Sequence, residues 1–244
     1  PFISSFACFI VLKGFDQLRM SVAYPRLNVK VVGSHGGITA GEDGASQQSV
    51  EDVALACSLP GFVVCVPSDE HQTRAAVEAA YRHVGPVYIR TGRPKVPLVY
   101  EAPPADFAFG RALEVREGGD ATIVANGTMV AAAIVAHERL RREGIMVRVL
   151  DMASVKPLDE EAVRRAAEET GAIVTAEEHL VHGGLGARVA QAVCRTRPVP
   201  MEFVGLEDTY AESGDAAALL EKYGLTADRI VMAVRKVLAR RKGS

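Results

Sequence analysis

Polar side chains able to do chemistry are concentrated in one glycine-rich segment, residues 33–48. It holds one imidazole, two carboxylates and two carboxamides, interleaved with five glycines. Glycine permits positive φ and lets a backbone approach a ligand closely. This set of donors and acceptors is suited to recognising a polyol. The groups belong to His35, Glu42, Asp43, Gln47 and Gln48.

Each of these residues also has an ordinary structural explanation. A histidine beside glycines is often a hydrogen-bonded loop residue, and Asp43-Gly44 is a common turn dipeptide. Gln47, near an expected helix start, could satisfy backbone donors there. A glycine-rich loop is weak support for phosphate binding. The residues by themselves therefore indicate a ligand loop without naming its ligand.

The elements around this loop predict an α/β sheet. A strand is expected at 29–32 before the loop, and a helix with Ser46 as its N-cap after it. Further strands are expected at 62–66 and 86–90, joined by a helix that an Asp69-x-x-Gln72 capping box opens. Alternation of this kind implies parallel strands, with ligands beyond their carboxyl ends.

The chain is expected to form two consecutive α/β domains, each a mostly parallel sheet flanked by helices. Proline-rich residues 93–107 interrupt the pattern, so we place the boundary at residue 104, giving domains 1–104 and 105–244. In the second domain, strands are expected at 122–125, 146–150, 172–175 and 201–204, and helices at 129–142, 159–170 and 185–193, with two more on either side of Gly224.

Composition excludes several classes of function. The 244 residues are 48% hydrophobic and 24% charged, with a formal net charge of −2, so nothing favours nucleic acid or membrane as a partner. No apolar run approaches the roughly 18 residues of a membrane helix. Four cysteines without a C-x-x-C pair suggest a reduced, cytoplasmic setting. The chain opens at Pro1 in an apolar stretch, which suggests a fragment starting inside a buried element.

Several stretches, in order and at similar spacing, resemble the transketolase family over nearly the whole chain. The most specific runs from His35 to Gln47 and includes Gly41-Glu42-Asp43-Gly44. The others include Pro1-Phe2-Ile3-Ser4-Ser5-Phe6-Ala7, Phe15-Asp16-Gln17-Leu18-Arg19-Met20, Ile89-Arg90-Thr91-Gly92-Arg93-Pro94, Lys156-Pro157-Leu158-Asp159 and Gly183-Gly184-Leu185-Gly186.

The resemblance implies that the first domain binds the pyrimidine end of thiamine diphosphate. Phe6 and Phe9 would pack on its aminopyrimidine ring, although apart from the resemblance core packing is the commoner explanation for such aromatics. Gln47 would reach the cofactor or the bound sugar.

It also implies a sugar-phosphate site. His35 would hydrogen-bond hydroxyls near the reacting carbon and assist catalysis, and Asp43 would accept from a substrate hydroxyl. Arg93 would bind the phosphate through its guanidinium, the alternative being a surface arginine. The reaction would move a two-carbon ketol unit from a ketose phosphate to an aldose phosphate, as in the pentose phosphate pathway.

Two family features are expected to come from elsewhere. The activating glutamate precedes the segment that corresponds to Pro1-Phe2, and no Gly-Asp-Gly motif occurs to hold Mg²⁺ or Ca²⁺ with the diphosphate. No metal ligands are assigned within this chain. We therefore expect an N-terminal transketolase half or subunit as partner, a homo-oligomer such as a dimer of active units, and no activity from this chain alone.

Three alternatives stay open at this point. One is the β subunit of a 2-oxoacid dehydrogenase, a second is deoxyxylulose-phosphate synthase, and a third is a non-catalytic module that retains the fold. Gly33-Ser34-His35 and Gly41-Glu42-Asp43-Gly44 favour transketolase, because they fit a sugar-phosphate site. For the cluster Glu177-Glu178-His179 we expect a structural or interface role, since neighbouring strand residues point to opposite faces.

Overall fold

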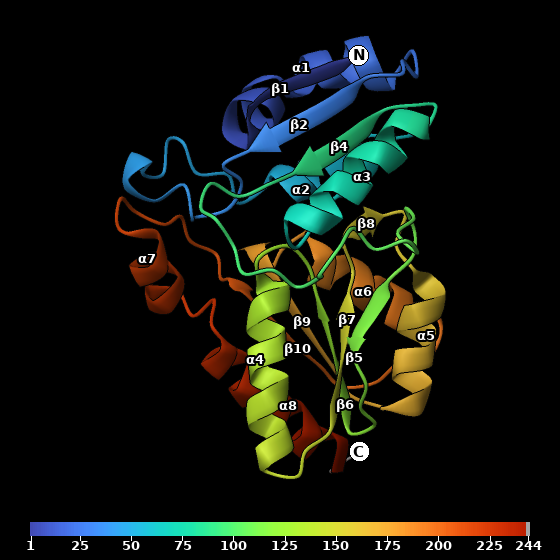
Figure 1. The fold of residues 1–244 in the computed structure, drawn as a ribbon, viewed down its shortest axis with the longest axis vertical. Helices are drawn as coiled ribbons and strands as arrows, with labels where there is room; N and C mark the ends of the chain where they lie inside the picture. Colours follow the sequence, from blue (N-terminus) through green and yellow to red (C-terminus); the bar gives the residue numbers. More distant parts are fainter. Residues whose placement is uncertain (243–244) are drawn as a thin grey trace.

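The computed structural model describes residues 1–242 as two five-stranded sheets, one above the other (Figure 1). The first sheet has the order β1-β2-β4-β3-β8, and all its pairs are parallel except β3 with β8. Its strands are β1 (Phe2–Phe6), β2 (Lys30–Ser34), β3 (Val63–Cys65), β4 (Val87–Arg90) and β8 (Ser154–Lys156).

Helices cover both faces of this sheet. Alternate strand residues point to opposite faces, so Tyr88 packs with η1, η2 and α2, whereas Val87 packs with α3. The helices are η1 (Cys8–Lys13), α1 (Phe15–Leu18), η2 (Arg19–Ala23), η3 (Gly41–Asp43), α2 (Asp52–Ser58) and α3 (Glu70–Arg82).

The second sheet has the order β10-β9-β6-β7-β5, with only β5 antiparallel to its neighbour. Ile123 and Val174 pack with α4 and α8, and Val124 and Ile173 with α5 and α6. These elements are β5 (Leu113–Arg116), β6 (Ala121–Ala125), α4 (Met129–Arg142), β7 (Val147–Asp151), α5 (Glu160–Glu169), β9 (Ile173–Leu180), α6 (Leu185–Arg195), β10 (Met201–Leu206), α7 (Ala216–Lys222) and α8 (Ala227–Lys242).

The predicted fold class is confirmed, and most predicted elements occur. Asp69 caps α3 by accepting from the Gln72 amide, and the helix at 129–142 has the predicted bounds. The division at residue 104 stays a prediction, because β8 from the second half pairs with β3 in the first sheet. No helix among residues 1–242 has the length and apolar character needed to cross a membrane.

Two predictions about local structure were wrong. Ser46 is not an N-cap: α2 begins at Asp52, and Ser46 lies in turns over residues 44–48 that are closed by hydrogen bonds to the Gly44 carbonyl. The first residues are not a buried element either. Phe2 and Ile3 are 45% and 40% exposed, because β1 lies at the edge of the sheet and pairs only with β2.

Candidate functional site

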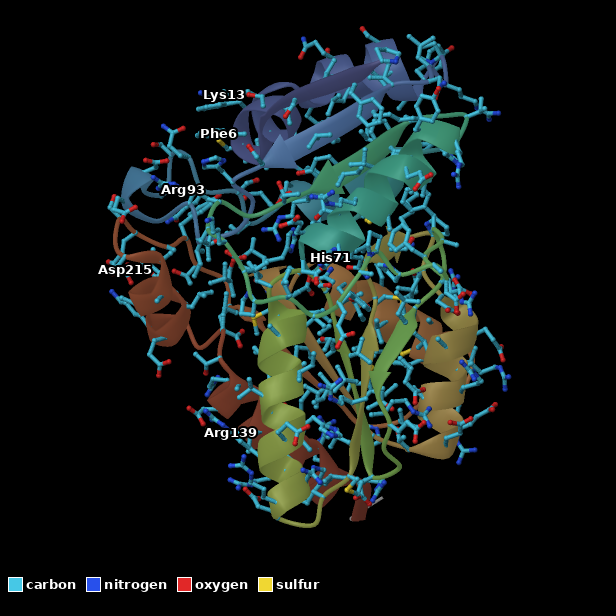
Figure 2. All side chains as sticks on the ribbon, viewed as in Figure 1. Phe6, Lys13, His71, Arg93, Arg139 and Asp215 are labelled. Carbon is cyan, nitrogen blue, oxygen red and sulfur yellow. The ribbon has the colours of Figure 1, made fainter. Side chains whose placement is uncertain are left out.

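Three neighbouring parallel strands deliver the predicted site residues to one edge of the first sheet. Phe6 ends β1 and pairs in register with Ser34 at the end of β2, so His35 follows directly beside it. Arg93 lies three residues beyond the end of β4. Figure 2 shows Phe6 and Arg93 on the same side of the first domain. The carboxyl ends of adjacent parallel strands are where ligands bind in α/β sheets.

Aromatic rings form a stack at the end of β1. The His35 and Phe6 rings lie 3.7 Å apart between centroids, with 14° between their planes. On η1, Phe9 continues the stack at 5.7 Å and 8° from Phe6, and the Lys13 ammonium lies 4.7 Å from the Phe9 centroid. His35 adopts a left-handed φ of +59°, a conformation rare for residues other than glycine. The rings of His35, Phe6 and Phe9 therefore form one continuous, partly exposed aromatic stack.

The surroundings of His35 favour the neutral form of its imidazole. Its Nδ1 lies 3.0 Å from the Ser34 hydroxyl. Burial lowers the pKa of His35 and the Arg93 cation lowers it further, while Asp43 opposes this shift. A neutral imidazole carries one donor and one acceptor nitrogen, which suits hydrogen bonding to sugar hydroxyls.

Arg93 and Asp43 form an ion pair at the site. The Arg93 guanidinium donates to the Ala40 carbonyl at 2.6 Å and to Glu42 at 3.1 Å, and its Nη1 lies 3.6 Å from Asp43 Oδ2. Arg93 remains 40% exposed, so a second anion can reach it. The structure thus brings together all three predicted substrate-binding residues, with an internal carboxylate partner for the arginine.

The two glutamines of the loop differ in a way that the sequence did not reveal. Gln48 is buried, and its amide donates to the carbonyls of Ile38 and Glu212, so it holds the loop together. Gln47 donates only a 3.3 Å contact to Ser46. The Oε1 atoms of both glutamines are shielded from solvent without a hydrogen-bond partner. An orphaned acceptor beside the site is a group that a ligand can satisfy.

A buried polar network lies beneath the loop, and sequence reasoning missed its central residue. Arg90, only 4% exposed, donates to the Glu178 backbone carbonyl at 2.8 Å. Its Nε lies 3.4 Å from Asp52 Oδ2, which also accepts from the Tyr88 hydroxyl at 2.6 Å. Arg90 ends β4, three residues before Arg93. The sequence signal for Arg90 is a charged residue at the end of an otherwise apolar strand, where charged side chains are rarely buried without a partner.

The Glu177-Glu178-His179 cluster has structural contacts in all three positions. Glu177 accepts from the amides of Leu185 and Gly186 at 2.7 Å, at the N-terminus of α6. His179 Nε2 accepts from the Ala54 amide at 3.3 Å, across to the first domain. Glu178 contacts the ligand loop. Within residues 1–242 no three metal-ligating side chains are grouped to hold a metal ion.

Comparison with known families covers both halves of the chain. Residues 1–99 match the transketolase pyrimidine binding domain, and residues 110–230 match the transketolase C-terminal domain. The resemblance inferred from the sequence is thereby confirmed.

Individual relatives point the same way. A 6-deoxy-6-sulfo-D-fructose transketolase subunit from Clostridium sp. (strain MSTE9) is 47% identical over 99% of this chain and 74% of its own length. A subunit of an apulose-4-phosphate transketolase from Phocaeicola vulgatus is 41% identical over 94% of this chain and 73% of its own length.

A solved split-gene transketolase, described as an inactive β4 tetramer, is 49% identical with a TM-score of 0.92, covering 98% of this chain and 76% of its own. The transketolase from Leishmania mexicana has a TM-score of 0.79 at 26% identity, and this chain covers 34% of it. The chain belongs to the transketolase family and carries that family's pyrimidine-binding and C-terminal domains.

Proposed function

We propose that this chain is the C-terminal half of a thiamine-diphosphate-dependent transketolase that acts on sugars with an anionic end. One observation carries the proposal. The ends of three adjacent strands bring an aromatic stack, a hydroxyl-binding pair and an accessible guanidinium to one edge of the sheet. In a transketolase chain, these groups correspond to the needs of a cofactor ring, a polyol and an anionic terminus.

The residues present fit the pyrimidine end of thiamine diphosphate. Phe6 and Phe9 are half-buried, so they offer aromatic surface that is partly dry, and the unpartnered Gln47 Oε1 can accept from an amino group or a hydroxyl. When bound, the cofactor supplies a carbon nucleophile that allows a bond next to a ketose carbonyl to be cleaved. Phe6, Phe9 and Gln47 would hold its ring and exclude water.

We assign the sugar to the loop and to Arg93. His35 and Asp43 would orient hydroxyls near the reacting carbons, with His35 in its neutral form. Arg93 would bind the anionic end, with the ligand replacing Glu42 as its partner. The relatives named above act, by their names, on a sulfo sugar and a sugar phosphate. We propose a phosphate or a sulfonate as this end.

The remaining parts of the site would come from a partner. We propose that an N-terminal transketolase half supplies the activating glutamate and the groups that hold Mg²⁺ or Ca²⁺ with the diphosphate. Support comes from the relatives, which are named as subunits. The β4 tetramer of a relative supports a homo-oligomer as the resting assembly. Four free cysteines support a cytoplasmic setting.

Reconstitution with a panel of donors tests this function. The chain, an N-terminal half of a split transketolase, thiamine diphosphate and Mg²⁺ would be mixed with glyceraldehyde 3-phosphate and one ketose donor. Fructose 6-phosphate, 6-deoxy-6-sulfofructose and fructose would be compared, with products identified by mass spectrometry. We expect two-carbon transfer from an anionic donor and little from fructose. Absence of transfer from every donor, with the complex assembled, would refute the proposal.

A further inference from the structure

Glu178 lies in the second domain, but its side chain contacts the ligand loop of the first. It sits near the end of β9 and is 2% exposed. Its Oε1 accepts from the Thr39 backbone amide at 2.8 Å, and its Oε2 accepts from the Thr128 hydroxyl at 3.2 Å. Thr39 lies between His35 and Asp43, so one carboxylate is attached midway between the two proposed sugar-binding residues.

The loop backbone is shaped to receive this carboxylate. Gly37 has a φ of +82°, and a Cβ at that position would lie 2.1 Å from Glu178 Oε1. No side chain fits there without moving the carboxylate or the loop. On the other side, the Glu178 carbonyl accepts from Arg90, so this one residue is bonded to both β4 and the loop. Hydrogen bonds accepted by an ionised carboxylate are about twice as strong as those between neutral groups.

We propose that Glu178 is a positioning residue for sugar recognition, through which the C-terminal domain sets the geometry of the loop that carries His35 and Asp43. This inference rests on the proposed function of that loop. A chain segment with several glycines has many accessible conformations, and a fixed amide at its centre restricts them further. The C-terminal domain is then a working part of the sugar site rather than a scaffold beside it.

A role limited to domain packing makes a different prediction. If Glu178 only joins the domains, its loss lowers stability and leaves the affinity for sugar unchanged. If it positions the loop, its loss raises KM for the ketose even at temperatures where the protein is fully folded. Val163, buried in the core of the second domain, gives a matched control, because truncating it lowers stability without touching the loop.

The test compares Glu178→Ala, Glu178→Asp, Glu178→Gln and Val163→Ala in the complex with the N-terminal half. We expect KM for the ketose to rise about 10- to 100-fold in Glu178→Ala and in Glu178→Asp, whose shorter side chain withdraws from Thr39 while still folding. Glu178→Gln keeps an oxygen facing Thr39, so KM should stay within about threefold. Val163→Ala should lower the melting temperature alone. A KM unchanged in Glu178→Asp, or raised equally by Val163→Ala, overturns the proposal.

Hydrogen exchange on the chain separates this inference from the proposed function. Exchange of the Thr39 amide should be at least about tenfold faster in Glu178→Asp than in Glu178→Gln, whether or not the complex turns over. Equal protection overturns the positioning role. If the wild-type complex has no transferase activity but the exchange pattern is as expected, the proposed function is refuted. The role of Glu178 in fixing the loop is then still supported.

Discussion

The imidazole of His35 stacks on the ring of Phe6, with their centroids 3.7 Å apart. The stack follows from parallel pairing, since Phe6 and Ser34 are in register at the ends of β1 and β2. It joins the proposed cofactor slot to the proposed sugar site by direct contact. We therefore expect substitutions at Phe6 to affect sugar binding and substitutions at His35 to affect cofactor binding.

Replacing Phe6 by leucine should weaken thiamine diphosphate binding about fivefold in the assembled enzyme. The substitution keeps apolar volume but removes the aromatic face, and stacking contributes about 1 kcal/mol beyond burial. Titration calorimetry would measure the cofactor Kd. Phe2→Leu, on the same strand and 45% exposed, serves as the control and should bind as wild type does. Equal affinity for Phe6→Leu and wild type would remove Phe6 from the slot.

Arg93→Gln should raise KM for an anionic ketose about 10- to 100-fold, because a charge-assisted contact is lost. For a neutral ketose such as fructose, KM should change little. Steady-state kinetics on both donors gives the change in KM for the anionic ketose relative to the change for the neutral ketose. Arg74→Gln removes an exposed arginine that pairs with Glu70 on α3, and it should leave both KM values unaltered. A similar rise for both donors with Arg93→Gln would show that the arginine acts on loop structure instead.

The pKa of His35 should rise in Arg93→Gln. Burial and the Arg93 cation lower the pKa of His35, and Asp43 raises it, so removing the cation leaves Asp43 opposed by burial alone. Asp43→Asn should move the pKa in the other direction. In wild type, burial and the Arg93 cation lower the pKa of His35 from its ordinary value of 6.5. An NMR titration of the His35 ring on the chain alone measures this, and a fall in Arg93→Gln would contradict the assigned geometry.

Much of the fold could be predicted from the sequence, because continuous apolar runs and helical spacing are local. Strands such as β6 and the helix α4 follow from such patterns. The stack of His35 on Phe6 depends on the register between two strands, and the contact of Glu178 with Thr39 joins residues 139 positions apart. Such pairs have no local signature. Ser46 was misplaced because turns within the loop replace the expected first turn of α2.

The buried carboxyl group of Asp151 should make the stability of the fold depend on pH. Asp151, at the end of β7, accepts from Ser68, Gln72 and Tyr100 through its Oδ2, and its Oδ1 has no partner. Burial raises the pKa of Asp151 to about 6, and the three hydrogen bonds oppose this only in part. The folded state then binds the proton more tightly than the unfolded state does. This contribution to stability is full below about pH 4 and is lost as pH rises through about 6.

Asp151→Asn should therefore remove part of the pH dependence. Relative to wild type, the variant should gain stability between pH 4 and pH 8, by at most on the order of 3 kcal/mol. Urea unfolding at several pH values measures the difference. Asp106→Asn, which changes an exposed aspartate paired with Arg111, is the control and should show no such trend. A stability difference between Asp151→Asn and wild type that stays constant with pH would contradict the raised pKa.

The proposed function assigns one half of a transketolase site to this chain. Two-carbon transfer from an anionic ketose, measured while the N-terminal half is titrated into a fixed amount of this chain with thiamine diphosphate and Mg²⁺, tests it most directly. We predict no turnover without the partner and a rate that rises until the two halves are equimolar. Turnover by the 244-residue chain alone would contradict this assignment, as would the absence of turnover from a fully assembled complex.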